Sequence, residues 1–139
     1  MDDTDEDTAC YAETTREIQI SVRPYYLDEQ SAPEKGHYLF AYQVRIENLG
    51  PDTVQLRNRY WRITDAHGRT QEVRGAGVVG EQPILGPGDT FEYTSGTPLS
   101  TETGFMVGSY EMVTEDGEHF DAAVPAFSLD SPFAAKRLN

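Results

Sequence analysis

The chain has 139 residues, which is enough for one domain with a hydrophobic core that needs no metal or disulfide support. Its formal net charge is −13, and an acidic surface repels phosphate backbones and anionic headgroups, so we expect no binding to nucleic acids or membranes. A single cysteine, the absence of a membrane-length apolar run and a start without signal-peptide features predict a cytoplasmic protein.

The chain divides into three parts by composition. Residues 1–16 are polar and acidic and lack a hydrophobic repeat, so we expect a disordered N-terminal arm. Residues 17–129 contain the alternating apolar positions of a folded domain. Residues 130–139 are expected to form a loose tail.

Alternation of apolar and polar residues predicts β-strands along the whole domain. The first begins at Ile18 and is expected to end at Pro24, and the strongest alternation runs over residues 38–46. Further strands are expected at residues 54–56, 60–64, 69–74, 91–93, 106–112 and 120–126. Pro125 places the last of these at a sheet edge, whereas the Pro- and Gly-rich residues 82–89 are expected to lie outside the ladders.

No segment has helical periodicity, so about eight short strands predict an all-β antiparallel sandwich or barrel. Large aromatic side chains lie mostly on the predicted inward faces of these strands. We interpret them as core residues rather than as a stacking platform for bases: Tyr38, Phe40, Tyr42, Trp61, Phe91, Tyr93, Tyr110 and Phe120.

Residues 75–80, Gly-Ala-Gly-Val-Val-Gly, match the G-x-G-x-x-G spacing of nucleotide-binding loops. In a dinucleotide-binding fold this loop leads from a strand into a helix, whose N-terminus faces the pyrophosphate. Here the loop leads into Glu81 and then into a Pro- and Gly-rich run, so no helix follows. This context excludes a dinucleotide-binding fold.

Two interpretations of this glycine loop remain open. Backbone N–H groups in a glycine-rich turn can hold an anion, and nearby arginines can pair with a phosphate, although Glu81 opposes this. Alternatively, the glycines only allow the chain to cross between sheets. The candidate binding residues are Arg74, Gly75, Gly77, Gly80 and Gln82, flanked by Arg59 and Arg69.

Several segments resemble the ApaG family: residues 18–31, RYWRITDAHG at 59–68, EVRGAGVVGEQPILGPGDTFEYTSG at 72–96, and residues 108–129. The resemblance covers about residues 17–129 and implies an immunoglobulin-like or fibronectin type III-like β-sandwich. It also implies a small cytoplasmic protein linked to cobalt and magnesium efflux, whose gene lies near that of a diadenosine tetraphosphate hydrolase. In eukaryotes similar domains are attached to F-box and DNA-polymerase-interacting proteins, which implies protein binding.

This chain departs from the family pattern at two positions. Tyr60 stands where the family often has histidine, and Thr97 where it often has cysteine. Both departures weaken any metal or thiol chemistry that the resemblance would imply.

The residues themselves carry no reaction signature. The three histidines lack the spacing of a metal-binding pair, Ser95 lies outside a G-x-S-x-G elbow, and no cofactor fingerprint is present. We therefore expect no enzyme, no cofactor and no metal site. A weaker alternative is a magnesium site in the acidic hairpin formed by Glu115, Asp116, Glu118 and Asp121.

The favoured hypothesis is a non-catalytic binding module that contacts a protein partner or a phosphorylated small molecule through the glycine loop. By resemblance, it would affect divalent-cation handling indirectly. The alternative is a hydrolase or regulator that acts on dinucleoside polyphosphates or pyrophosphate. An exposed edge strand would also allow two copies to pair as a homodimer.

Overall fold

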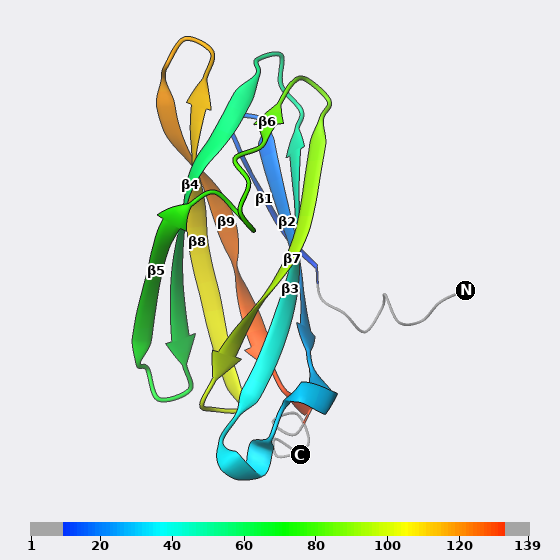
Figure 1. Ribbon diagram of the computed structural model, residues 1–139, viewed down its shortest axis with the longest axis vertical. Coiled ribbons are helices and arrows are strands. Elements are labelled where there is room, and N and C mark those ends of the chain that lie inside the picture. The colour runs from blue at the N-terminus through cyan, green and yellow to red at the C-terminus, as the bar shows by residue number, and fades with distance from the viewer. Residues whose placement is uncertain (1–9, 133–139) are drawn as a thin grey trace, which may run out of the picture.

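The computed structural model describes residues 10–132, which form two antiparallel β-sheets packed face to face (Figure 1). One sheet has the order β1 (Tyr11–Thr15), β2 (Ile18–Tyr26), β3 (Tyr38–Asn48) and β7 (Thr90–Leu99). The other has the order β5 (Thr70–Ala76), β4 (Val54–Asp65), β8 (Thr103–Thr114) and β9 (His119–Asp130), and β6 (Ile84–Leu85) pairs with one end of β4. The predicted immunoglobulin-like or fibronectin type III-like sandwich is confirmed.

Helical structure between residues 10 and 132 is limited to short turns. Two 3₁₀ helices, η1 (Asp28–Gln30) and η2 (Pro33–Lys35), connect β2 to β3. No helix in this part of the chain is long and apolar enough to cross a membrane.

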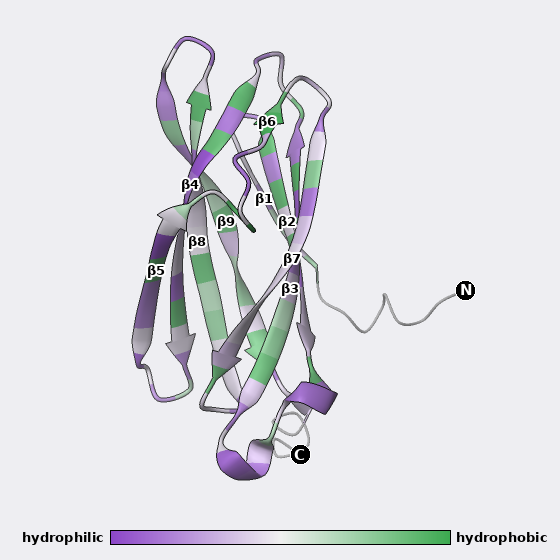
Figure 2. Cartoon of the chain, in the orientation of Figure 1, coloured by the Kyte–Doolittle hydropathy of each residue, from purple (hydrophilic) through white to green (hydrophobic). Residues whose placement is uncertain are grey.

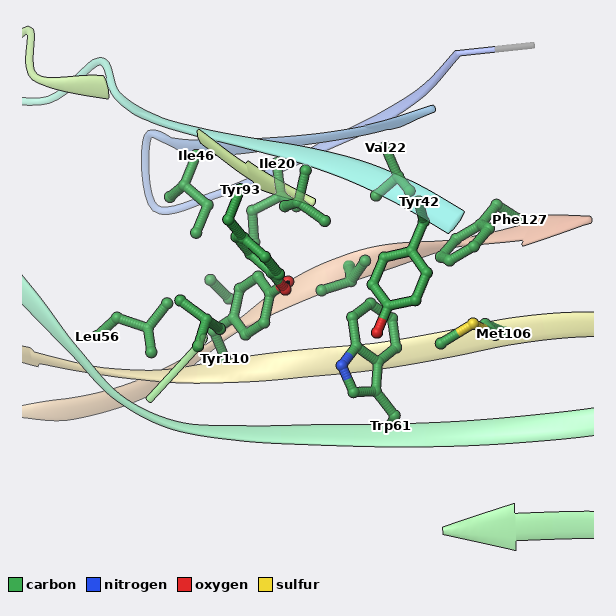
Figure 3. Close-up of a cluster of buried hydrophobic side chains, with 14 of the residues drawn as sticks. Ile20, Val22, Tyr42, Ile46, Leu56, Trp61, Tyr93, Met106, Tyr110 and Phe127 are labelled. Atoms are coloured by element: carbon green, nitrogen blue, oxygen red, sulfur yellow. Dashed lines mark hydrogen bonds between the residues drawn. The ribbon is translucent and has the colours of Figure 1, made fainter. Parts of the chain in front are cut away.

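The core lies between the sheets and is built from alternate residues of each strand (Figure 2). Tyr42 of β3 packs on Trp61 of β4 with ring centroids 5.3 Å apart, and Trp61 stands edge-on to Tyr110 of β8 at 6.1 Å. Figure 3 shows these rings together between the two layers. All eight predicted aromatic positions are buried or partly buried against the core, as expected.

β4 is one strand, not the two short strands that the sequence suggests. A bulge at Arg57 shifts its register against β8 between Leu56 and Asn58. Because one extra residue reverses the alternation, Arg59 lies on the same inner face as the buried Trp61. This reversal places an arginine on the core side of the sheet.

Three further strand predictions need correction. Pro24 does not end the first strand, because β2 continues to Tyr26 opposite Phe40. The segment after the glycine loop does form a ladder, since Leu85 is buried opposite Val54. The strand expected at residues 120–126 is longer, since β9 runs to Asp130, and a register shift against β8 brings Phe127 rather than Ala126 into the core; the predicted edge position of this strand is confirmed.

The prediction of disorder at residues 1–16 is wrong for residues 11–16, and residues 1–9 lie outside the described chain. β1 pairs with β2 through a two-residue turn, and the guanidinium of Arg16 forms an ion pair with Glu118 at 2.9 Å. The same guanidinium lies 4.4 Å from the ring centroid of Phe120. These contacts fix β1 in place, although its acidic composition predicts disorder.

The prediction of a loose tail at residues 130–139 is wrong for Asp130 and Ser131. Asp130 still belongs to β9, and the N–H of Ser131 donates to the carbonyl of Glu102 at 2.9 Å. Residues 133–139 lie outside the described chain.

Candidate binding site

The two long sides of the sandwich are closed differently. On one side β1 and β2 contact β9 across the sheets. On the other side, where β5 and β7 are the edge strands, the segment between β5 and β6 crosses the opening. Figure 1 shows this segment running from the end of β5 into the space between the sheets before it turns toward β6. We call residues 75–82 the glycine loop.

A tight hairpin forms the centre of the glycine loop. The N–H of Val78 donates to the carbonyl of Glu81 at 2.8 Å, and the N–H of Glu81 donates back at 2.9 Å. The two residues between them, Val79 and Gly80, have φ angles of 43° and 81°, as a type I′ turn requires. Val78 is only 1% exposed, so it fills the opening between the sheets as part of the core.

Close approach and backbone conformation account for the glycines. A Cβ on Gly77, which has a φ of 64°, would lie 2.3 Å from the carbonyl oxygen of Glu81. A Cβ on Gly75 would lie 2.8 Å from the guanidinium of Arg59. The N–H of Gly77 is also used, because it donates to the carbonyl of Arg57 at 2.9 Å. The geometry favours the crossing interpretation of the motif over an anion-holding one.

The loop brings some of the predicted binding residues together and separates others. Arg59 donates from Nη1 to the carbonyls of Ala76 and Gly77 at 3.1 and 3.0 Å. Gln82 is tied to β4, since its side chain donates to the carbonyl of Arg57 at 2.9 Å. Arg69 lies at the opposite end of β5, where it pairs with Asp65 at 2.9 Å, so it does not flank the loop.

Arg74 points away from the core, on the outer face of the five-stranded sheet. Its guanidinium lies 4.4 Å from the ring centroid of Tyr60 and 3.9 Å from the carboxylate of Glu72. The hydroxyl of Tyr60 donates to Glu72 at 2.5 Å, and this hydrogen bond raises the pKa of the phenol. The contacts with Tyr60 and Glu72 therefore fix the guanidinium of Arg74 in a solvent-exposed position, and we call this pair the Tyr60–Arg74 stack.

A groove of about 600 Å³ runs beside this stack on the outer face. Asn58 donates to Glu111 at 2.5 Å, and a ring nitrogen of His119 lies 3.0 Å from the same carboxylate. The hydrogen bond from Asn58, followed by that from His119, lowers the pKa of Glu111. We call this space the outer groove; it is lined by Asn58, Arg59, Tyr60, Arg74, Gly75, Ala76, Ser109, Glu111 and Asp121.

A second space of about 190 Å³ lies between the sheets beneath the glycine loop. We call it the inner pocket; it is lined by Tyr42, Arg59, Trp61, Val78, Val79, Gly80, Tyr93 and Ser95. The hydroxyls of Tyr93 and Tyr110 meet at 2.5 Å, and burial raises the pKa of both (Figure 3). The pocket therefore combines aromatic walls with hydroxyl groups and one arginine.

No three side chains of the metal-binding types His, Cys, Asp and Glu converge anywhere between residues 10 and 132. In the acidic hairpin suggested as a magnesium site, Glu118 is held by two hydrogen bonds from Arg16 at 2.9 and 3.2 Å. Asp121 lies apart from it, in the lining of the outer groove.

Sequence reasoning identified Arg59 and Gly80 of the inner pocket, but not the rest of its lining, nor Tyr60 and Glu111 of the outer groove. A Val-Gly pair gives no signal for a type I′ turn, which favours Asn-Gly or Asp-Gly. Glu111 and Asn58 meet only through the pairing of β4 with β8, across a bulge.

Comparisons with known proteins agree with one another. The family model described as the ApaG domain matches residues 28–114. The chain is 63% identical over 129 residues to Protein ApaG of Paramagnetospirillum magneticum, covering 93% of this chain and 99% of the relative. It is 64% identical, with the same coverage, to Protein ApaG of Rhodospirillum centenum. The crystal structure of the Bordetella pertussis ApaA protein superposes with a TM-score of 0.80 at 50% identity, covering 87% of this chain and 95% of that one.

Proposed function

Since the chain belongs to the ApaG family, and its relatives are named without any catalytic activity, we propose that it is a non-catalytic module that binds a protein partner. The partner contacts the tip of the glycine loop and the neighbouring Tyr60–Arg74 stack. The observation that carries this proposal is the conformation of Val79.

Val79 is strained and exposed at the same time. Its φ of 43° is an outlier for a β-branched side chain, and conformations of this kind cost about 1–3 kcal/mol. The side chain is nevertheless 53% exposed, so little packing offsets the strain. A glycine would fit this turn position with less strain. An exposed apolar side chain held in such a conformation is typical of a contact made with another molecule.

The surroundings of Val79 suit a protein better than a phosphorylated small molecule. Three N–H groups of the loop, on Gly77, Val78 and Glu81, already donate to backbone carbonyls. Two carboxylates, Glu111 and Asp121, line the outer groove and repel phosphate. Tyrosine and arginine, which form the exposed stack, are residue types enriched at the energetic centres of protein interfaces.

Strand β5 adds a backbone surface next to the stack. Among the strands of residues 10–132 it pairs with β4 alone, and most of its residues are exposed and hydrophilic (Figure 2). An edge strand of this kind offers backbone hydrogen bonds to a partner segment. We place the protein in the cytoplasm, and any effect on cobalt or magnesium would then be indirect, through the bound partner.

The test compares partner capture by tagged full-length variants in the source cells. Arg74→Glu reverses the charge of the stack without touching the core, so we expect at least a tenfold loss of the captured partner, quantified by mass spectrometry. Arg45→Glu is the matched control, because Arg45 is also a surface-exposed, ion-paired arginine, and it lies on the other sheet. Equal capture by both variants, with unchanged thermal unfolding, would overturn the proposed face.

A further inference from the structure

Arg59 is a charged side chain on the inner face of a sheet, and it makes no ion pair with any carboxylate between residues 10 and 132. Its Nη1 group donates to two loop carbonyls, which leaves the N–H groups of Nε and Nη2 without a hydrogen-bond partner in that range. Arg59 is half-buried, and these N–H groups remain accessible to solvent and to a ligand. Although the chain has a net charge of −13, no carboxylate of the described residues pairs with this inward arginine.

Other donors face the same space. The indole N–H of Trp61 has no hydrogen-bond partner in the described chain, and Trp61 lines the inner pocket together with Arg59. The hydroxyl-bearing side chains of Tyr42 and Ser95 also line the pocket. Figure 3 shows the hydroxyl of Tyr42 directed toward the indole of Trp61. No carboxylate lines this pocket, which distinguishes it from the outer groove.

We infer that the inner pocket binds a small organic carboxylate, with Arg59 as its cationic partner and the indole of Trp61 as a second donor. A guanidinium pairs with a planar carboxylate through two parallel hydrogen bonds. The apolar part of the ligand packs against the ring of Trp61 and the side chain of Val79.

The size and charge of the pocket restrict the ligand. At about 190 Å³ the pocket is smaller than the usual 300–1,000 Å³ of drug-sized sites, so it takes only a few heavy atoms beyond the carboxylate. One arginine balances a single negative charge, whereas a phosphate dianion would need more positive charge than this pocket supplies. The proposed partner and this ligand share Val79, which lines the inner pocket, but different arginines carry them: Arg74 on the outer face for the partner and Arg59 in the pocket for the ligand.

Trp61 is the only tryptophan of the chain, so its indole ¹H–¹⁵N resonance reports directly on the pocket. We would titrate the full ¹⁵N-labelled chain with propionate, with the neutral isostere propionamide, and with inorganic phosphate. The expected result is a saturable shift of the indole resonance with propionate only. No shift, an equal shift with propionamide, or tighter binding of phosphate would overturn the inference.

Two arginine variants on the same strand sharpen the test. Arg59→Gln removes the proposed partner, and we expect propionate to bind at least tenfold more weakly. Arg62→Gln is the control, because Arg62 lies on the outer face of β4 and should leave binding unchanged. Equal propionate affinity in the Arg59→Gln variant and the wild type would rule out the assigned role.

Arg59→Gln also removes the hydrogen bonds to the loop carbonyls and so could loosen the fold. Ser95→Ala therefore provides a second variant, which alters the pocket wall without touching the loop. We expect a folded protein whose indole shift with propionate requires a several-fold higher concentration. If the indole responds as in the wild type, Ser95 has no part in the site and the assigned pocket is wrong.

Discussion

The two long sides of the sandwich each depend on a two-residue turn with left-handed backbone at a residue other than glycine. On the β1–β9 side, Arg16 and Glu17 have φ angles of 47° and 68°. On the β5–β7 side, Val79 has a φ of 43° beside Gly80. The left-handed backbone is similarly strained at the two turns, but the contacts that offset this strain differ.

At the first turn, contacts made by the side chains of Arg16 and Glu17 offset the backbone strain. Arg16 pairs with Glu118 and covers Phe120, and the side chain of Glu17 packs against Gly50. The carbonyl of Glu17 also accepts from the N–H of Leu49 at 2.8 Å. At the second turn, the side chain of Val79 is largely exposed, and Arg59 in the nearby pocket forms no ion pair with any carboxylate between residues 10 and 132. We infer from this difference that the turn on the β1–β9 side is structural, whereas the turn on the β5–β7 side is kept for binding.

The largest expected effect comes from Gly77→Ala, which disrupts the glycine loop on the β5–β7 side and leaves the β1–β9 side unchanged. A Cβ there would lie 2.3 Å from a backbone oxygen, and φ is 64°, so we expect a loss of about 3 kcal/mol in the free energy of unfolding. Urea denaturation measures it. Gly80→Ala is the matched control, because φ is 81° but nothing lies within 4 Å, so the loss should be only about 1 kcal/mol. Equal losses would show that the close approach is not the cause.

Tyr93→Phe tests the polar interior on the β5–β7 side. It leaves the buried hydroxyl of Tyr110 without its partner, so we expect a loss of about 1–2 kcal/mol in the free energy of unfolding. The double variant Tyr93→Phe/Tyr110→Phe removes both hydroxyls and should be less destabilised than the sum of the single variants. Additive losses would mean that the two hydroxyls are not coupled.

Val79→Gly tests whether the strained backbone of Val79 serves binding of the protein partner. We expect the free energy of unfolding to rise by about 0.5–1 kcal/mol, because the relieved strain exceeds the entropy that glycine adds to the unfolded chain. Partner capture should fall at the same time. Glu17→Gly at the other turn is the control and should gain little stability, since it loses the packing against Gly50. A Val79→Gly variant with lower stability or undiminished capture would contradict the comparison.

The strand pattern of the core could be predicted from the sequence because buried strands alternate with a period of two. The strand at residues 38–46 was correctly predicted for this reason and lies within β3. Errors arose where tertiary contacts override local pattern. β1 is acidic and weakly patterned, and the contacts of Arg16 with Glu118 and Phe120, about a hundred residues away in sequence, hold its turn in place.

The candidate site was harder to predict than the fold. The glycine motif was correctly located as a loop without a following helix, but which side of the sheet each arginine faces depends on the bulge at Arg57. Bulges carry no period-two signal, so Arg59 and Arg74 could not be assigned to opposite faces beforehand. Arg69 is near these arginines in sequence, but the length of β5 separates it from the loop.

The smallest expected effect is electrostatic and concerns the β1–β9 side. The hydrogen bond from Arg16 lowers the pKa of Glu118 in the folded state. A lowered pKa contributes stability above the unfolded value of about 4.3, and this contribution disappears as the pH falls through the folded value. Arg16→Gln should therefore be less stable than the wild type at neutral pH, with a difference that narrows in acid.

The remaining difference at low pH separates the two contacts of Arg16. Protonation of Glu118 removes the ion pair but leaves the guanidinium over Phe120. Urea denaturation at several pH values, with an NMR titration of the Glu118 carboxyl, resolves both contributions, and the pKa of Glu118 should rise in the variant. A pH-independent difference would mean that stacking on Phe120, rather than the ion pair, closes this side of the sandwich.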